Sequence, residues 1–374
     1  MLFVPSIEEG LALARRVDPK YAPAWQGRSP EDQAAMARYF LPHRSAKALL
    51  APTRPRVVKW YCPFADQREF PSGHRYCINV YTGCAHKCEY CYAAGYEPQQ
   101  PGCKKDFERL LRKDLDDLEQ FNVPPAPVHL SNSTDAFQPL EAAIGQTRLA
   151  LEQLARYRHR FTTVTVLTKN PLLTARDDYA DLFGRLAVLP RDHPRAGEFS
   201  EHGLPTVLLE VSLAFWREDA RCVLEAGAPP VAQRMEGIRR LRQAGVPVVL
   251  RIDPLLPRSP LGDKTWADFG LPDPQTLNDL DLLLGFAAEV GVMHVVYSVA
   301  KITRPRRGGM SDVRKNLLAG YRHLVGARGL VFRGGSWRLP DDVAHRQVAE
   351  SFLSLCQRHG LRAVFCKQNL ISTP

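Results

Sequence analysis

Short apolar runs alternate with amphipathic segments between residues 76 and 326. Runs rich in β-branched and aromatic residues predict strands at 76–81, 128–130, 162–168, 205–213, 246–252 and 292–299. Apolar residues at helical spacing predict helices at 106–121, 140–157, 171–186, 230–244, 273–290 and 311–325. Regular alternation of strand and helix implies a parallel sheet covered by helices, with right-handed crossovers. The pattern therefore predicts an α/β fold, with a loop at the polar stretch 190–204.

The two ends of the chain lie outside this alternation. Residues 1–75 contain helical patterns at 8–16 and 30–41, followed by prolines that interrupt them, which predicts an N-terminal extension packed on the core. Residues 327–374 contain a short apolar run, a helical pattern at 341–359 and a strand pattern at 361–366. We predict that this C-terminal segment caps the open edge of a core formed by residues 76–326.

Three cysteines stand in a C-x3-C-x2-C spacing directly after the first predicted strand: Cys84, Cys88 and Cys91. Gly83 ends that strand, so the cysteines are expected on a loop at its C-terminal end. Thiolates are the ligands that iron–sulfur clusters prefer. Three of them leave one iron of a 4Fe-4S cluster without a protein ligand, and an open metal position accepts a small molecule. The spacing therefore predicts a cluster that binds a small-molecule cofactor.

A zinc site and a disulfide are the alternatives for the same cysteines. Structural zinc needs a fourth Cys or His at ligand spacing, and His86 is too close in sequence to complete a tetrahedron. A disulfide needs an oxidising compartment, whereas nine cysteines behind an N-terminus without a secretory pattern predict a reducing cytoplasm. No run approaches about 18 apolar residues, so no membrane span is expected. We therefore favour the cluster, in a cytoplasmic protein.

The cysteine spacing, with Tyr90 directly before the third cysteine, resembles the cluster loop of the radical S-adenosylmethionine enzymes. Further segments resemble the spore photoproduct lyase-like branch of that superfamily, namely Asn132–Glu141, Leu167–Asn170, and Ser212 with Leu224–Arg234. The resemblance implies a partial, open (β/α)6 barrel of the TIM type, with its site at the C-terminal ends of the strands. It also implies a 4Fe-4S cluster, S-adenosylmethionine, a 5′-deoxyadenosyl radical that abstracts hydrogen, and an external one-electron reductant of the flavodoxin or ferredoxin type.

The resemblance further implies residues that contact the carboxylate, the amino group and the adenine of S-adenosylmethionine. They are, in that order, Lys169 and Ser212, Ser133 and Asp135, and Tyr90 and Tyr297. Ordinary structural roles stay open for several of them. Lys169 is alternatively a solvated loop lysine, Ser212 a plain strand residue and Asp135 the N-cap of the next helix. Glu225 and Arg234 are interpreted as an ion pair that holds the loop after the fourth strand.

One departure from the branch concerns the hydrogen donor. The branch carries a cysteine just past the second strand that returns a hydrogen atom to the product radical, whereas this chain reads Ser131–Thr134 there. Repair of the spore thymine dimer by that route is therefore not expected. Three other cysteines remain candidate hydrogen donors: Cys62, Cys103 and Cys366.

The chain is basic, with a net charge of +10, an isoelectric point near 9.2 and its densest basic cluster at Arg304–Gly309. This charge favours acidic partners such as nucleic acid, although solvated helix faces explain much of it as well. Three hypotheses stay open. The chain is a radical enzyme acting on nucleic acid in a lyase- or repair-like reaction, a radical enzyme modifying a peptide or small metabolite, or a nucleic-acid-binding protein with a structural or redox-sensing cluster.

Overall fold

The computed structural model describes residues 57–59, 76–96, 100–120 and 125–366. Its main sheet contains, in spatial order, β1 (Val58–Lys59), β2 (Tyr76–Ile78), β5 (Ala126–Leu130), β6 (Phe161–Thr168), β7 (Val207–Ser212), β8 (Val248–Leu255), β9 (Val295–Val299) and β13 (Ala363–Phe365). The strands from β2 to β13 run parallel, and β1 is antiparallel to β2. The order has two ends, so the described strands form an open sheet. The predicted α/β class and open parallel barrel are confirmed.

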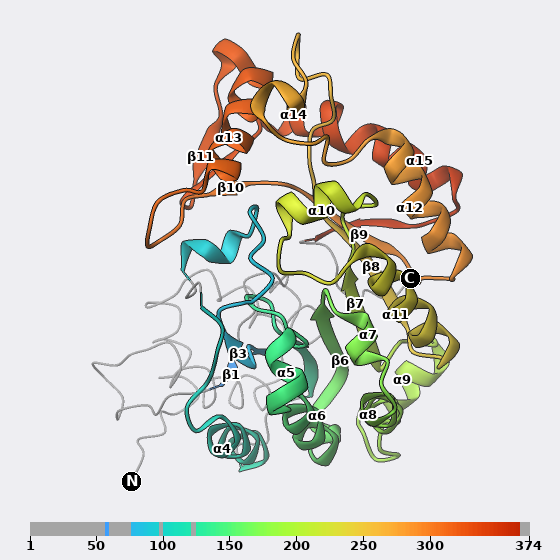
Figure 1. Ribbon diagram of the computed structural model, residues 1–374. Coiled ribbons are helices and arrows are strands. Elements are labelled where there is room, and N and C mark those ends of the chain that lie inside the picture. Colours follow the sequence, from blue (N-terminus) through green and yellow to red (C-terminus); the bar gives the residue numbers. More distant parts are fainter. Residues whose placement is uncertain (1–56, 60–75, 97–99, 121–124, 367–374) are drawn as a thin grey trace, which may run out of the picture.

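Helices follow the strands along the chain and cover the sheet (Figure 1). They are α4 (Phe107–Gln120), α5 (Pro139–Ile144), α6 (Gln146–Arg156), α7 (Pro171–Thr174), α8 (Asp177–Ala187), α9 (Ala196–Glu201), α10 (Glu218–Leu224), α11 (Val231–Gln243), α12 (Leu277–Glu289), α13 (Asp312–Val325), α14 (Asp341–Ala344) and α15 (Glu350–Arg358). None of these described helices is long and apolar enough to cross a membrane.

The structure corrects several predicted elements. The helix predicted at 140–157 is two helices, because Gly145 adopts a left-handed conformation with φ of 68° between α5 and α6. The helix predicted at 171–186 is likewise divided into α7 and α8. The predicted loop at 190–204 contains the short helix α9, which buries Phe199. Helix α10 and the hairpin of β11 (Val331–Arg333) and β12 (Ser336–Arg338) were not predicted.

Buried apolar side chains form two separate clusters on the two faces of the sheet. The large cluster lies between the sheet and the helices and includes Leu209 and Val211 of β7. Because strand residues alternate between faces, their neighbours point into the barrel. The small inner cluster consists of Leu208, Val249 and Val296. Polar side chains share this inner face, and there Arg251 Nη1 lies 2.7 Å from Glu210 Oε2.

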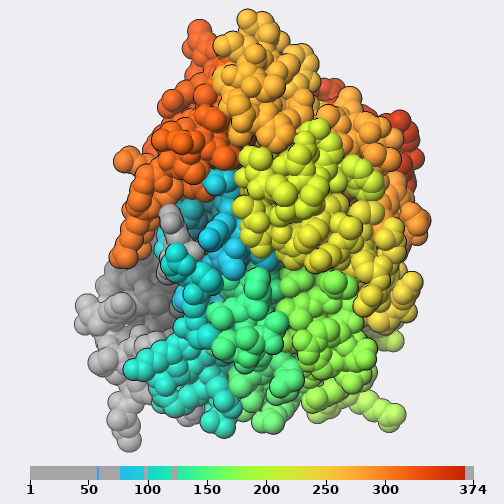
Figure 2. All heavy atoms as spheres, viewed as in Figure 1, coloured from blue at the N-terminus to red at the C-terminus, as the bar shows by residue number. Residues whose placement is uncertain are grey.

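The C-terminal ends of the parallel strands meet at one edge, where smaller elements gather. Strand β3 (Tyr81–Thr82) pairs with β4 (Gly102–Cys103), and the cysteine loop lies between them. A second small sheet has the order β10 (Ile302–Thr303), β12, β11. Figure 2 shows blue atoms of the cysteine-loop region between orange atoms of the segment after β9 and yellow-green atoms of the segment after β7. Strand β13 pairs with β9 at one end of the main sheet, and the capping role of residues 327–374 stays a prediction.

Candidate cluster and cofactor site

The cysteine loop curves tightly after β3. Gly83 and Lys87 have φ of 63° and 49°, and the Cys91 amide donates to the Cys88 carbonyl at 3.1 Å. Burial raises the pKa of Cys88 well above its usual value, the Lys169 ammonium opposes this, and negative charge on Cys91 and Cys84 adds to it.

The donor set of the cysteine loop consists of three free thiols, those of Cys84, Cys88 and Cys91. Within the described ranges, no set of three Cys, His, Asp or Glu side chains is arranged to hold one metal ion. Thiolates are the ligands that iron–sulfur clusters prefer, and each thiolate binds a different iron of the cluster. The chemistry of the donor set therefore fits a cluster.

Side chains from other strand ends hold the loop in place. The Ala85 amide donates to Gln138 Oε1 at 2.9 Å, and Gln138 Nε2 donates to the Gly83 carbonyl at 3.3 Å. His86 is buried, with Nε2 at 2.9 Å from Asp135 Oδ2 and Nδ1 at 3.2 Å from the Gly227 carbonyl. Both ring nitrogens of His86 thus have partners, in agreement with the interpretation that it is not a metal ligand.

Asp135 joins three segments rather than capping a helix. Its Oδ1 accepts from the Phe137 amide at 2.8 Å and from Thr168 Oγ1 at 2.7 Å, and its Oδ2 accepts from the Lys169 amide at 2.6 Å. Burial would raise the pKa of Asp135, but the interaction with His86 and these hydrogen bonds keep it below its usual value. The N-cap of α5 is Gln138, so the N-cap alternative for Asp135 is wrong.

The structure brings Lys169 and Ser212 together, at the ends of β6 and β7. Lys169 Nζ donates to Ser212 Oγ at 2.6 Å and lies 3.2 Å from Glu225 Oε1. Glu225 is fully buried, accepts a hydrogen bond from Tyr90 and lies 2.5 Å from Arg234 Nη2. The Lys169 side chain is only 13% exposed, so the solvated-lysine alternative is wrong. Sequence reasoning identified the Glu225–Arg234 pair but not its contact with Lys169.

The charges around Glu225 make its contribution to stability depend on pH. Burial would raise the pKa of Glu225, but Arg234 and Lys169 lower it from 4.5 to about 2. The stabilisation is complete above pH 4.5 and is lost as the pH falls through about 2. Between pH 7 and 2, the loss of this stabilisation should lower the free energy of unfolding by roughly 3 kcal/mol, and Glu225→Gln should abolish that decrease, as measured by urea unfolding.

Glu236→Gln is the control, because Glu236 forms an exposed pair with Arg240. It should change the pH dependence of the free energy of unfolding by under about 0.5 kcal/mol. The same pH dependence in both variants would contradict the role given to Glu225.

Two buried hydroxyls next to this site have no hydrogen-bond partner among the described residues. They are Ser131 Oγ and Thr134 Oγ1, in the loop after β5. Ser131 also has a φ of 62°, which is uncommon for a residue with a side chain. The predicted acceptor Ser133 instead contacts Tyr96, with 3.0 Å between the two hydroxyl oxygens. Sequence reasoning missed Thr134, although it lies inside the matched segment Asn132–Glu141.

Tyr297, which was predicted to border the adenine, packs on the helix side of the sheet. Its ring centroid lies 5.3 Å from that of Phe352 and 5.6 Å from that of Phe365. The next residue, Ser298, faces the barrel interior and donates to Asp253. The sequence did not define which face of β9 each residue occupies, and the contact of Tyr297 with the adenine stays a prediction.

The candidate hydrogen donors differ in their surroundings. Cys62 lies outside the described residues. Cys103 is exposed on β4. Cys366 lies after β13 with Sγ 2.9 Å from Arg251 Nη2, and burial raises its pKa. Of the two candidates that the structure describes, Cys366 is therefore the one that contacts the polar inner face of the barrel.

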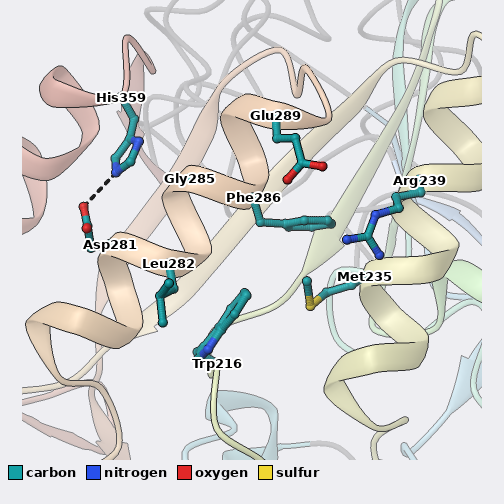
Figure 3. A pocket seen from close by; sticks show the side chains of 9 residues that line it. All are labelled: Trp216, Met235, Arg239, Asp281, Leu282, Gly285, Phe286, Glu289 and His359. Carbon is teal, nitrogen blue, oxygen red and sulfur yellow. Dashed lines mark hydrogen bonds and ion pairs between the residues drawn. The ribbon is translucent and has the colours of Figure 1, made fainter.

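A separate pocket of about 370 Å³ lies in the helical layer, between α11, α12 and the end of α15 (Figure 3). Its wall includes Trp216, Met235 and Phe286, and at one side His359 Nε2 lies 2.7 Å from Asp281 Oδ1. None of the predicted site residues lines it. We do not assign the predicted chemistry to this pocket.

Gly227 allows the loop before α11 to lie against the cysteine loop. A Cβ atom at this position would lie 2.1 Å from the Ala85 carbonyl oxygen and 3.1 Å from His86 Cα. We expect Gly227→Ala to lower the free energy of unfolding by about 1–3 kcal/mol and to displace the cysteine loop, measured by urea unfolding and by iron content after reconstitution. Gly184→Ala, on α8 with nothing within 4 Å, should instead stabilise by about 0.5–1 kcal/mol. Equal effects of the two changes would contradict this role.

A solved structure shares the fold of this chain. A point mutant of spore photoproduct lyase superposes with a TM-score of 0.52, covering 84% of this chain and 80% of that one at 11% identity. This chain has the fold of spore photoproduct lyase. The predicted resemblance is thus confirmed at the level of the fold, including the open parallel barrel.

Sequence relatives carry no assigned activity. An uncharacterised protein of Mycobacterium tuberculosis is 26% identical over 262 residues, which cover 67% of each chain. An uncharacterised protein of Methanocaldococcus jannaschii is 25% identical over 185 residues, covering 50% of this chain and 62% of that one. No family model matches the chain.

Proposed function

We propose that the chain is a radical S-adenosylmethionine enzyme whose 4Fe-4S cluster is bound by Cys84, Cys88 and Cys91. The observation that carries this proposal is geometric: Tyr90, the residue before Cys91, donates to Glu225, and the Lys169 ammonium beside Glu225 donates to Ser212. A cluster held by these three cysteines would supply the electron for reductive cleavage of S-adenosylmethionine to a 5′-deoxyadenosyl radical, which would abstract hydrogen from the substrate. An external one-electron reductant of the flavodoxin or ferredoxin type would reduce the cluster again.

The residues around the thiols supply a partner for each charged group of the cofactor. Burial would lower the pKa of Lys169, but Glu225 raises it above its usual value, so the ammonium is available for a carboxylate. Ser212 adds a hydroxyl donor beside it. The unpaired hydroxyls of Ser131 and Thr134 are acceptors for the amino group. Asp135 acts as a positioning residue, since its oxygens are already bonded.

Nucleic acid is the substrate class that we propose. Arg304, Arg306 and Arg307 are exposed, and the Arg306 amide donates to the Ala94 carbonyl at 3.0 Å, in the turn that follows Cys91. On the neighbouring small sheet, Phe332 is 58% exposed and its ring lies 5.1 Å from that of Trp337. Basic and aromatic side chains together favour nucleic acid over a peptide or a small metabolite.

Anaerobic reconstitution tests the proposal. The protein should take up about four irons, and with dithionite and S-adenosylmethionine it should release 5′-deoxyadenosine and methionine. If a cluster forms but no cleavage occurs, the chain is a nucleic-acid-binding protein with a structural or redox-sensing cluster. A salt-dependent mobility-shift assay with DNA and RNA then decides the substrate class, because phosphate contacts weaken as salt increases.

A further inference from the structure

Helix α13 reaches from the sixth β–α unit to the cysteine loop. Its residue Arg314 is buried, and the guanidinium donates to the Glu89 carbonyl at 2.7 Å, to the Thr303 carbonyl at 3.2 Å and to the Cys88 carbonyl at 3.5 Å. The N-cap of α13, Ser311, donates from its hydroxyl to the Glu89 carboxylate. The N-terminal turn of α13 therefore binds both the backbone carbonyl and the side-chain carboxylate of Glu89.

Arg314 carries a charge that its contacts do not neutralise. In the part of the chain that the structure describes, all its hydrogen-bond acceptors are carbonyls, and it makes no ion pair within 4 Å. Burial lowers the pKa of Arg314, and negative charge on Glu89, Cys91 and Cys88 only partly offsets this. A buried cation is costly unless an anion lies near it. The nearest groups that gain negative charge when a cluster binds are the thiolates of the loop.

We propose that Arg314 is a positioning residue and counter-charge for the cluster site, which fixes the Cys88–Glu89 backbone and favours the reduced, more negative cluster. This inference rests on the proposed cluster. The mechanism is electrostatic, because a fixed positive charge in a low-dielectric site stabilises added negative charge and raises the reduction potential. Residues outside the ligand set commonly act on metal centres in this way.

The test is the midpoint potential of the reconstituted protein, measured by anaerobic spectroelectrochemical titration. Arg314→Gln should lower the equilibrium constant for one-electron reduction about tenfold, which is a shift of about 59 mV to lower potential. Arg314→Lys should retain most of the wild-type potential, because it keeps the charge. Glu89→Gln should raise the potential, because it removes a negative charge from the same site. This variant provides the test if the Arg314→Gln protein does not fold.

Arg158 provides a matched control at the opposite end of the sheet. It is also buried, and its hydrogen-bond acceptors among the residues placed in the structure are likewise all carbonyls, those of Leu186, Phe161, Thr162 and Thr206. Arg158→Gln should reduce stability and leave the potential unchanged. Unchanged potentials in both Arg314→Gln and Glu89→Gln, with S-adenosylmethionine cleavage retained, would overturn this inference and leave the proposed function standing. Failure of the wild-type protein to bind a cluster would overturn both.

Discussion

A chain in which Cys88 is replaced by alanine is expected to bind no stable 4Fe-4S cluster and to release no detectable 5′-deoxyadenosine. The cysteine loop supplies three thiols to the proposed cluster, so the loss of one leaves two of these ligands. Cys88 is also the cysteine whose carbonyl contacts Arg314 and whose thiol is influenced by Lys169. The measurements are iron and sulfide content and product release under dithionite, with circular dichroism to show that the fold is kept.

Cys222→Ala is the control for this experiment. Cys222 is exposed on α10, outside the cysteine loop. Its replacement should leave iron content and cleavage at wild-type values. Wild-type cleavage by the Cys88→Ala protein would show that the cluster, if one binds, is held elsewhere.

Lys169→Met is expected to raise the Kd for S-adenosylmethionine about 10- to 100-fold without loss of the cluster. A hydrogen bond to a charged group contributes about 1.5–3 kcal/mol, and about 1.4 kcal/mol corresponds to a tenfold change in Kd. Lys169 is held beside Ser212 and Glu225, so its ammonium is already in position before the cofactor binds. Anaerobic equilibrium dialysis against the reconstituted protein measures the change.

The exposed Lys315 offers a matched lysine for comparison. Its ammonium lies 2.8 Å from Asp312 Oδ1, and its side chain is 62% exposed. Lys315→Met should therefore leave the Kd unchanged. An unchanged Kd in Lys169→Met would assign Lys169 to the stabilisation of Glu225 alone.

The sequence predicted most barrel strands because parallel strands buried on both faces require long apolar, β-branched runs, as in Phe161–Thr168. It did not predict helix α10 or the β11–β12 hairpin, whose sequences are short. The hairpin had a usable signal, the Gly334–Gly335 turn between two short apolar and aromatic runs. Gly145 was the corresponding signal for the break between α5 and α6.

The sequence indicated candidate site residues where a short motif or a strand end marked them, and it gave no signal where distant segments meet. Lys169 and Ser212 lie in contact because each ends a strand, and adjacent parallel strands place their ends together. The face of β9 that Tyr297 occupies could not be predicted, because a shift of one residue moves a strand side chain to the other face. Arg314 had no local signal, since only the folded chain brings α13 to the cysteine loop.

The contacts that hold the cysteine loop span very different lengths of chain. Gln138, Gly227 and Arg314 lie 53, 141 and 225 residues from the loop residues that they contact. Contacts of such long range form late in folding, and a growing chain folds from its N-terminal side. During synthesis the three cysteines therefore leave the ribosome long before their supports exist. The loop reaches its final shape only after α13 has been made, so the order of translation delays the maturation of the site.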